Sequence, residues 1–155
     1  MIINNKAELK DIISEAKSSG KKVLVKKGVF DIIHPGHVFA IEEFVKQSDV
    51  IVILVQSDEF TSKKKGDNRP INSQEQRMKV IDGLSGVNYV YPDTCMSRNE
   101  YISFLEYLSP DIVAVSSIDE EKTQTYSGRG LGLQEFPDKN LPGYSTTEII
   151  RKCMR

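Results

Sequence analysis

The feature that most constrains the fold is an uninterrupted apolar run, DVIVILVQ, at residues 49–56. A strand with one face in water alternates apolar and polar residues, whereas a continuous β-branched run is typical of a strand covered on both faces. Helices cover both faces of a sheet when right-handed crossovers join parallel strands. The run therefore predicts a strand inside a parallel sheet that lies between two layers of helices.

Helical and strand-like segments alternate along the rest of the chain, without repeats or a low-complexity linker. This alternation predicts one α/β domain over residues 1–155, with a Rossmann-like, three-layer α/β/α arrangement and a five-stranded parallel sheet. Ligands of such sheets bind beyond the carboxyl ends of the strands, so site residues are expected directly after the strands. The predicted strands are residues 22–27, 49–56, 87–91, 111–116 and a weaker 131–136; the predicted helices begin near Asn5, Val38, Ser73, Ser97 and Ser145, and residues 57–72 are predicted to form a polar loop.

Composition excludes several classes of function. The chain carries 21 basic and 22 acidic residues, whereas proteins that bind nucleic acids or anionic membranes generally have a basic excess. No apolar run approaches the roughly 18 residues that span a bilayer, and the amino-terminal sequence lacks the pattern of a signal peptide. We therefore expect a cytoplasmic protein without nucleic-acid or membrane partners. Cys95 and Cys153 lie far apart without CxxC spacing, which favours reduced thiols over a disulfide or a metal pair.

The segment after the first predicted strand, GVFDIIHPGH at residues 28–37, has the features of a phosphate site. Gly28 lets the backbone approach a ligand, and Pro35 suits the first turn of a helix. The amino end of that helix offers free N–H groups and the positive end of its dipole. His34 and His37, the only histidines, are three residues apart and can donate hydrogen bonds to phosphate from one side. The alternative is a helix cap with two incidental histidines.

The pattern GxFDxxHxGH resembles the nucleotide-binding signature of the cytidylyltransferase-like nucleotidyltransferase superfamily, whose HxGH is shared with class I aminoacyl-tRNA synthetases. The resemblance implies that His34 and His37 are catalytic, contacting the triphosphate and stabilising charge at the reacting α-phosphate. A protein-bound metal is not predicted, because Asp31 is the only further ligand that the motif offers. Mg²⁺ is expected with the triphosphate, held by phosphate oxygens and water. By the same resemblance, the nucleotide-binding residues of this segment are Gly28, Val29, Phe30, Asp31 and Gly36.

Basic residues follow the second predicted strand. A run of lysines at residues 63–65 can hold the phosphate of an acceptor and neutralise charge during transfer; the alternative is a solvated charged surface. The segment KGDNRPINSQEQR, residues 65–77, resembles the KGxxRPxxxxxxR stretch of sugar-phosphate nucleotidyltransferases of the heptose type. The resemblance implies that Lys65 is catalytic and, with Arg69, binds the acceptor. It also implies that Arg77 contacts the nucleotide or its phosphates; the alternative is an ordinary exposed helix arginine.

A third motif, STTEII, begins at the amino end of the last predicted helix. Ser145 and Glu148 have the spacing of a capping box, which by itself explains those two residues. Three consecutive hydroxyl side chains exceed what a cap needs, and they lie where a helix terminus favours phosphate. The motif resembles the superfamily's carboxyl-terminal STT motif, which implies that Ser145, Thr146 and Thr147 hold the outer phosphates of the nucleotide.

The three motifs occur in the family's order and together span most of residues 22–155. RPIN and PGYSTTEII are most similar to the adenylyltransferase module of bacterial heptose-phosphate enzymes. Glycerol-phosphate cytidylyltransferases come second: QSDEF fits them, but Asn140 replaces an arginine often found before their STT. Both groups usually carry a turn rich in glycine and aspartate after the fourth strand, where this chain has SSID at residues 116–119. The base and the acceptor therefore stay open from the sequence.

The resemblance implies transfer of a nucleoside monophosphate from ATP, or from CTP, to a sugar phosphate such as a heptose 1-phosphate, with release of pyrophosphate. A phosphorylated acceptor is already nucleophilic at neutral pH, so the reaction needs positioning and charge neutralisation rather than a general base. The alternatives are a polyol-phosphate cytidylyltransferase and a nucleotide-binding sensor without turnover; a synthetase catalytic fragment is disfavoured by size. Members of the family often pair, so a homodimer is expected.

Overall fold

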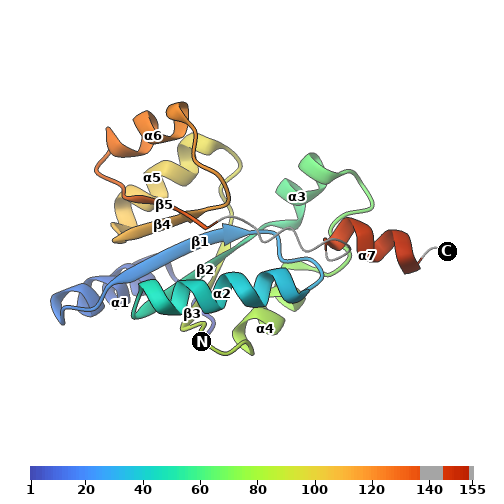
Figure 1. Ribbon diagram of the computed structural model, residues 1–155, viewed down its shortest axis with the longest axis horizontal. Coiled ribbons are helices and arrows are strands. Elements are labelled where there is room, and N and C mark those ends of the chain that lie inside the picture. The colour runs from blue at the N-terminus through green and yellow to red at the C-terminus, as the bar shows by residue number, and fades with distance from the viewer. Residues whose placement is uncertain (137–144, 154–155) are drawn as a thin grey trace.

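A computed structural model of the protein describes residues 1–136 and 145–153. Within these residues, five strands form one parallel sheet in the order β3-β2-β1-β4-β5, and helices cover both of its faces (Figure 1). The predicted α/β class with a five-stranded parallel sheet is thereby confirmed. No helix in the described part of the chain is both long and apolar enough to span a bilayer. The strands are β1 Val23–Gly28, β2 Val50–Gln56, β3 Tyr89–Asp93, β4 Ile112–Val115 and β5 Leu133–Glu135; the helices are α1 Lys6–Ser18, α2 Pro35–Gln47, α3 Asp58–Lys65, α4 Gln74–Asp82, α5 Arg98–Leu108, α6 Glu120–Ser127 and α7 Thr146–Cys153.

The strand order creates a switch point between β1 and β4. From β1 the chain runs outward through β2 to β3 on one side, and then returns past β1 to form β4 and β5 on the other. Connections that leave in opposite directions diverge at the carboxyl ends of the two middle strands, which opens a crevice there. The segments that follow β1 and β4 therefore meet where α/β sheets of this kind bind ligands. In Figure 1, α3 and α7 lie beyond this end of the sheet.

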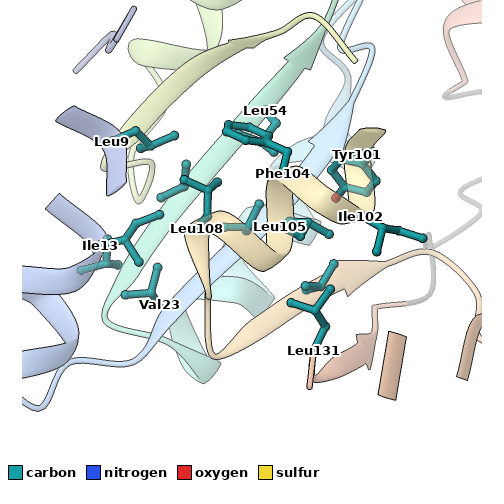
Figure 2. Packing of buried hydrophobic residues seen from close by; sticks show 14 of the residues in the cluster. Leu9, Ile13, Val23, Leu54, Tyr101, Ile102, Phe104, Leu105, Leu108 and Leu131 are labelled. Carbon is teal, nitrogen blue, oxygen red and sulfur yellow. The ribbon is translucent and has the colours of Figure 1, made fainter. Parts of the chain in front are cut away.

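The two faces of the sheet bury separate apolar clusters. In β2, Val52 and Leu54 belong to the cluster under α1 and α5, whereas Ile51 and Ile53 belong to the cluster under α2 and α4. Figure 2 shows Leu54 among side chains of α1 and α5 in the first cluster. All four side chains are buried. The whole run is apolar because neither face of β2 reaches water.

Two helices depart from the predicted elements. Residues 57–72, predicted to be a loop, contain α3, and α6 follows β4 without a predicted counterpart. Neither helix has the apolar stripe by which helices are recognised in a sequence. Their amino ends are specified by capping instead: the Ser57 hydroxyl accepts the Phe60 N–H, and the Asp119 carboxylate accepts the Lys122 N–H. In α3, acidic residues in the first turn and lysines in the last turn also complement the helix dipole.

Candidate active site

A cavity of about 870 Å³ opens at the switch point, beyond the carboxyl ends of β1 and β4. Among the described residues, its walls come from five separate parts of the chain: the end of β1 with the turn into α2 and α2 itself, the end of β2, the end of α3 with the segment after it, the residue after β4, and the amino end of α7. The predicted site residues that line it are Gly28, Val29, Phe30, Asp31, His34, Gly36, His37, Lys65, Arg69, Ser145, Thr146 and Thr147.

The two histidines face each other at the amino end of α2. His34 is the N-cap residue and Pro35 is the first residue of the helix, so both imidazoles lie beside the free N–H groups of the first turn. The rings are stacked with their centroids 3.8 Å apart. Nδ1 of His37 accepts a long hydrogen bond, 3.4 Å, from the His34 backbone N–H. Because Nδ1 is an acceptor, the proton of a neutral His37 lies on Nε2, which can donate to a phosphate oxygen.

The His37 imidazole is neutral at physiological pH. Burial, followed by the charges of His34 and Lys26, lowers the pKa of His37 from 6.5 to about 4. Each of these causes disfavours the imidazolium form. The neutral His37 can therefore offer a phosphate an N–H hydrogen bond, and the lysine and arginine side chains of the cavity offer positive charge.

The packing of Phe30 adds a second reason for a glycine at position 28. Phe30 has a left-handed backbone conformation with φ 53°, and the centroid of its ring lies 5.1 Å from that of His37. A Cβ atom on Gly28 would lie only 2.6 Å from the Phe30 ring. A side chain at position 28 would therefore displace the ring that packs beside His37.

Asp31 fastens the segment after β1 to the segment before α4. Its buried carboxylate accepts a hydrogen bond of 2.6 Å from Arg69 Nε. It also accepts the backbone N–H groups of Ile71 and Asn72, at 2.8 and 3.0 Å. Burial alone would raise the pKa of this carboxyl, but the hydrogen bonds outweigh burial and lower it. The structure thus gives Asp31 a positioning role, because its carboxylate orients Arg69 at the cavity wall.

Arg77 lies behind the residues that line the cavity, and its predicted contact with the nucleotide stays a prediction. Its side chain is fully buried. The guanidinium donates to the carbonyl oxygens of Val29 and Gln56 and to the carboxylate of Asp58, and Nε donates to the carbonyl of Asn72. These acceptors belong to the ends of β1 and β2, the start of α3 and the segment before α4. Arg77 therefore holds together the segments that form the cavity.

The last turn of α3 brings lysines to the β2 side of the cavity. Lys65 lines the cavity as predicted, and Lys64 lines it as well. Lys63 instead pairs with Glu59 one turn earlier, at 2.8 Å and on the surface. A helix points consecutive residues in different directions, so the helical conformation decides which lysines reach the cavity. A prediction of a polar loop could not make that distinction.

The amino end of α7 brings the run of hydroxyl side chains to the cavity. The Glu148 carboxylate accepts the backbone N–H and the hydroxyl of Ser145, while the Ser145 hydroxyl accepts the Glu148 N–H. The predicted capping box is therefore confirmed. The Thr146 hydroxyl donates to the carbonyl of Ile32 at 3.4 Å, which connects α7 to the turn that carries the histidines. Asn140, where the cytidylyltransferases often have an arginine, lies outside the described residues.

Sequence reasoning missed three polar residues at the strand ends. Lys26 Nζ donates to the Ser116 hydroxyl at 3.2 Å, across the switch point from β1 to the end of β4. Lys27 forms an ion pair of 2.7 Å with the buried carboxylate of Asp93 at the end of β3. Lys26, Lys27 and Ser116 all line the cavity. The sequence does contain one indication of these residues, the pair of lysines that ends an otherwise apolar strand. A charge that is buried at such a place needs a partner or a ligand.

The cavity has an excess of positive charge although the chain is nearly neutral. Its acidic lining residues, Asp31 and Glu148, are both hydrogen-bonded to neighbouring groups of the protein. Within residues 1–136 and 145–153, no group of three or more His, Cys, Asp or Glu side chains is placed to hold a metal ion. Cationic walls of this kind suit a ligand with several phosphates. The basic lysine and arginine side chains of the lining are Lys26, Lys27, Lys64, Lys65 and Arg69.

Comparison with known proteins assigns the family. The model of a family described as cytidylyltransferase-like matches residues 25–152. The chain belongs to this family of nucleotidyltransferases. The match covers the three motifs at the cavity, and the family predicted from those motifs is confirmed.

Relatives match nearly the whole chain. The chain is 42% identical over 156 residues to the bifunctional protein HldE of Haemophilus influenzae (strain PittEE), covering 97% of this chain and 31% of that protein. It is 34% identical over 159 residues to the bifunctional protein HldE of Cronobacter sakazakii (strain ATCC BAA-894), covering 99% of this chain and 32% of that protein. The chain thus spans less than a third of the length of these curated relatives.

A solved structure shows the same fold. The crystal structure of the lipopolysaccharide core biosynthesis protein from Thermoplasma volcanium GSS1 matches with a TM-score of 0.62 and 22% sequence identity. The match covers 77% of this chain and 98% of the other.

The protonation of His37 can be followed by NMR. We expect its imidazole to titrate with a midpoint near 4, below the ordinary 6.5, and its neutral form to carry the proton on Nε2. Because the unfolded chain has the ordinary pKa, the free energy of unfolding should fall as the pH drops from 6.5 toward 4. His37→Asn should remove that part of the pH dependence. The variant His34→Asn completes the assignment of the two histidine signals, and a His37 midpoint near 6.5 would contradict this description of its environment.

The role of Arg77 can be tested by separating stability from substrate affinity. Arg77→Ala leaves buried carbonyl groups without donors, so we expect it to lower the free energy of unfolding by about 3–5 kcal/mol. Arg77→Lys should recover only part of this loss, because an ammonium cannot reach four acceptors in different directions. Arg129→Ala, which removes a surface pair with Glu106, is the matched control and should cost about 1 kcal/mol or less. If Arg77→Ala stays stable and only its KM for the nucleotide rises, Arg77 contacts the nucleotide directly instead of supporting the fold.

Proposed function

We propose that this chain transfers a nucleoside monophosphate, from ATP in preference to CTP, to a sugar phosphate such as a heptose 1-phosphate, and releases pyrophosphate. The observation that carries the proposal is the cationic cavity at the switch point, with the stacked histidines on one side and the lysines of α3 on another. The amino ends of α2 and α7 both reach this cavity. Helix amino ends and basic side chains together match the charge of a triphosphate beside a second phosphate.

In this proposal the triphosphate lies between α2 and α7. His34 and His37 donate hydrogen bonds to the α- and β-phosphates. Ser145, Thr146 and Thr147 hold the outer phosphates, which leave as pyrophosphate. The hydrogen bond from Thr146 to the turn before α2 supports this assignment, because it joins the two helix ends into one phosphate site.

The phosphate of the acceptor is assigned to the β2 side of the cavity. Lys65 and Arg69 bind it there, and Lys64 adds positive charge. The bond between Arg69 Nε and the Asp31 carboxylate supports this assignment, because it fixes one edge of the guanidinium and leaves the remaining donors for a ligand. The acceptor and the triphosphate then meet between the histidines and the lysines.

The reaction follows from this placement. An oxygen of the acceptor phosphate attacks the α-phosphorus in line with the bond to the bridging oxygen. A new P–O bond forms to the acceptor, while the bond from the α-phosphorus to the bridging oxygen breaks and its electron pair leaves with pyrophosphate. No proton has to be removed from the nucleophile. The protein therefore accelerates the step by positioning the two phosphates and neutralising their charge.

Mg²⁺ enters this proposal together with the nucleotide. Asp31 and Glu148 are hydrogen-bonded within the protein, and the described residues provide no carboxylate cluster for a resident metal ion. Such a donor set fits a hydrated ion held by phosphate oxygens. Bound in this way, Mg²⁺ neutralises part of the charge of the triphosphate, while the basic side chains of the cavity neutralise the rest.

The sugar phosphate is preferred as acceptor on the evidence of the motifs and the relatives. RPIN and PGYSTTEII resemble the heptose type, and the HldE proteins match over nearly the whole chain. The sequence of the turn after β4 differs from the corresponding turn in both related groups of enzymes. Hydrogen bonds within the protein hold this turn in place. Lys122 Nζ donates to the Ser117 carbonyl at 3.0 Å, and the Ile118 N–H donates to the Glu135 carboxylate at 3.4 Å.

We also propose that the chain pairs as a homodimer and works in the cytoplasm, where nucleoside triphosphates are available. Exposed apolar side chains on α2 and α4 support pairing. Val38 and Val45 on α2 are 41% and 51% exposed, and Val80 on α4 is 52% exposed. Exposed apolar side chains gain stability when a partner covers them.

Pyrophosphate release tests the proposed reaction. With Mg²⁺ present, the four common nucleoside triphosphates are each combined with sugar 1-phosphates, including heptose 1-phosphate, and with polyol phosphates. We expect release with ATP and heptose 1-phosphate. Release with CTP and a glycerol phosphate instead would establish the polyol alternative. Tight nucleotide binding without release for any acceptor would favour a sensor.

Substitutions then test the assigned roles. His37→Ala should lower kcat/KM by about 100- to 1000-fold, because it removes a hydrogen-bond donor to the reacting phosphate. Lys65→Ala should raise the KM for the acceptor more than the KM for the nucleotide. Lys63→Ala is the matched control from the same lysine run, because Lys63 pairs with Glu59 outside the cavity. Unchanged turnover in His37→Ala would overturn the mechanism.

A further inference from the structure

Lys26, near the end of β1, lines the cavity at the switch point. Side chains alternate between the two faces of a strand, and Leu24 of β1 belongs to the apolar cluster under α2. Lys26 therefore points to the same face as α2, whereas Lys27 points to the other face and pairs with Asp93. Lys26 is the register partner of Ala114 in β4, which places its ammonium above the junction of the two middle strands.

The ammonium of Lys26 lines the same cavity as the histidines and is hydrogen-bonded to the residue after β4. Its Nζ donates to the Ser116 hydroxyl at 3.2 Å, and Ser116 is the first residue after β4. Its charge is also one of the causes that lower the pKa of His37, after burial and the charge of His34. Lys26 and His37 thus act on the same part of the cavity, where both line the wall.

The other basic side chains of the lining lie elsewhere or are assigned to the acceptor. Lys64 and Lys65 come from the end of α3, on the β2 side of the cavity. Arg69 is bound to the Asp31 carboxylate. Lys26 differs from these residues because it comes from β1, lies on the same face of the sheet as α2, and lines the cavity together with His37.

We propose that Lys26 is a further phosphate-binding residue of the reaction, holding the α-phosphate of the nucleotide with its ammonium while the Ser116 hydroxyl positions that ammonium. This inference rests on the proposed function. In the transfer step, Lys26 neutralises charge on the non-bridging oxygens of the α-phosphate, and His37 donates a hydrogen bond to the same group. Lys26 keeps its protons throughout the reaction.

The test compares Lys26→Met, Lys26→Arg and Ser116→Ala with the control Lys22→Met. Lys22 precedes β1 at the opposite end of the same strand, where its side chain is exposed. For each variant, kcat, the KM for each substrate and the thermal midpoint are measured, and calorimetry gives the affinity for inorganic triphosphate. Calorimetry needs no acceptor, so it also tests Lys26 if the wild-type chain turns over none of the offered substrates and the proposed function fails.

We expect Lys26→Met to lower kcat/KM for the nucleotide by about 100-fold and to weaken triphosphate binding by about 10-fold. The KM for the acceptor and the thermal midpoint should stay near the wild-type values, Lys26→Arg should restore part of the loss, and Lys22→Met should behave like the wild type. Ser116→Ala should have a smaller effect, and it should add little to Lys26→Met, because the two residues act as one unit.

Three results would overturn the inference. Unchanged triphosphate affinity and turnover in Lys26→Met would show that its ammonium holds no phosphate. A raised KM for the acceptor alone would place Lys26 on the other substrate. A lowered thermal midpoint that accounts for the whole loss, with no rescue by Lys26→Arg, would show that the residue only supports the fold.

Discussion

The site depends on one buried guanidinium. Arg77 donates to two strand-end carbonyls, those of Val29 and Gln56, and to groups at the start of α3 and before α4. Burying a charged side chain is costly unless its donors are satisfied, and here several acceptors offset that cost. The same contacts satisfy carbonyl groups that the sheet leaves unpaired at its carboxyl end. These contacts join the segments after β1 and β2 to the segment before α4, next to the cavity.

The Asp31 carboxylate provides a second set of polar contacts that holds the segments around the cavity together. The Asp31 carboxylate binds Arg69 and two backbone N–H groups of the segment before α4, so the turn after β1 is joined to that segment twice. The charged residues of the two motifs therefore divide into two kinds. Asp31, at the cavity wall, and Arg77, behind it, hydrogen-bond to neighbouring segments and hold them together, whereas His34, His37 and Lys65 line the cavity.

The sequence predicted the features that depend on local pattern. The strand β2 could be predicted because burial of both faces makes every residue of the run apolar, and the three motifs could be placed because each follows a strand or begins a helix. The helix α3 could not, because capping and end charges specify it instead of an apolar stripe. The direction of Arg77 could not be predicted either, because its acceptors Val29 and Gln56 belong to other parts of the chain. Lys26 and Ser116 meet only through the pairing of β1 with β4, which no local pattern contains.

The central claim is that this cavity joins the α-phosphate of a nucleotide to the phosphate of a sugar. Phosphorus NMR of the protein with ATP, Mg²⁺ and heptose 1-phosphate follows every phosphorus atom of the reaction at once. We expect two coupled diphosphate signals to replace the monoester signal of the acceptor and the α signal of ATP, in equal amount to free pyrophosphate. Formation of ADP with inorganic phosphate, or of ADP with a doubly phosphorylated sugar, would contradict the account, because the bond broken would then lie between the β- and γ-phosphates.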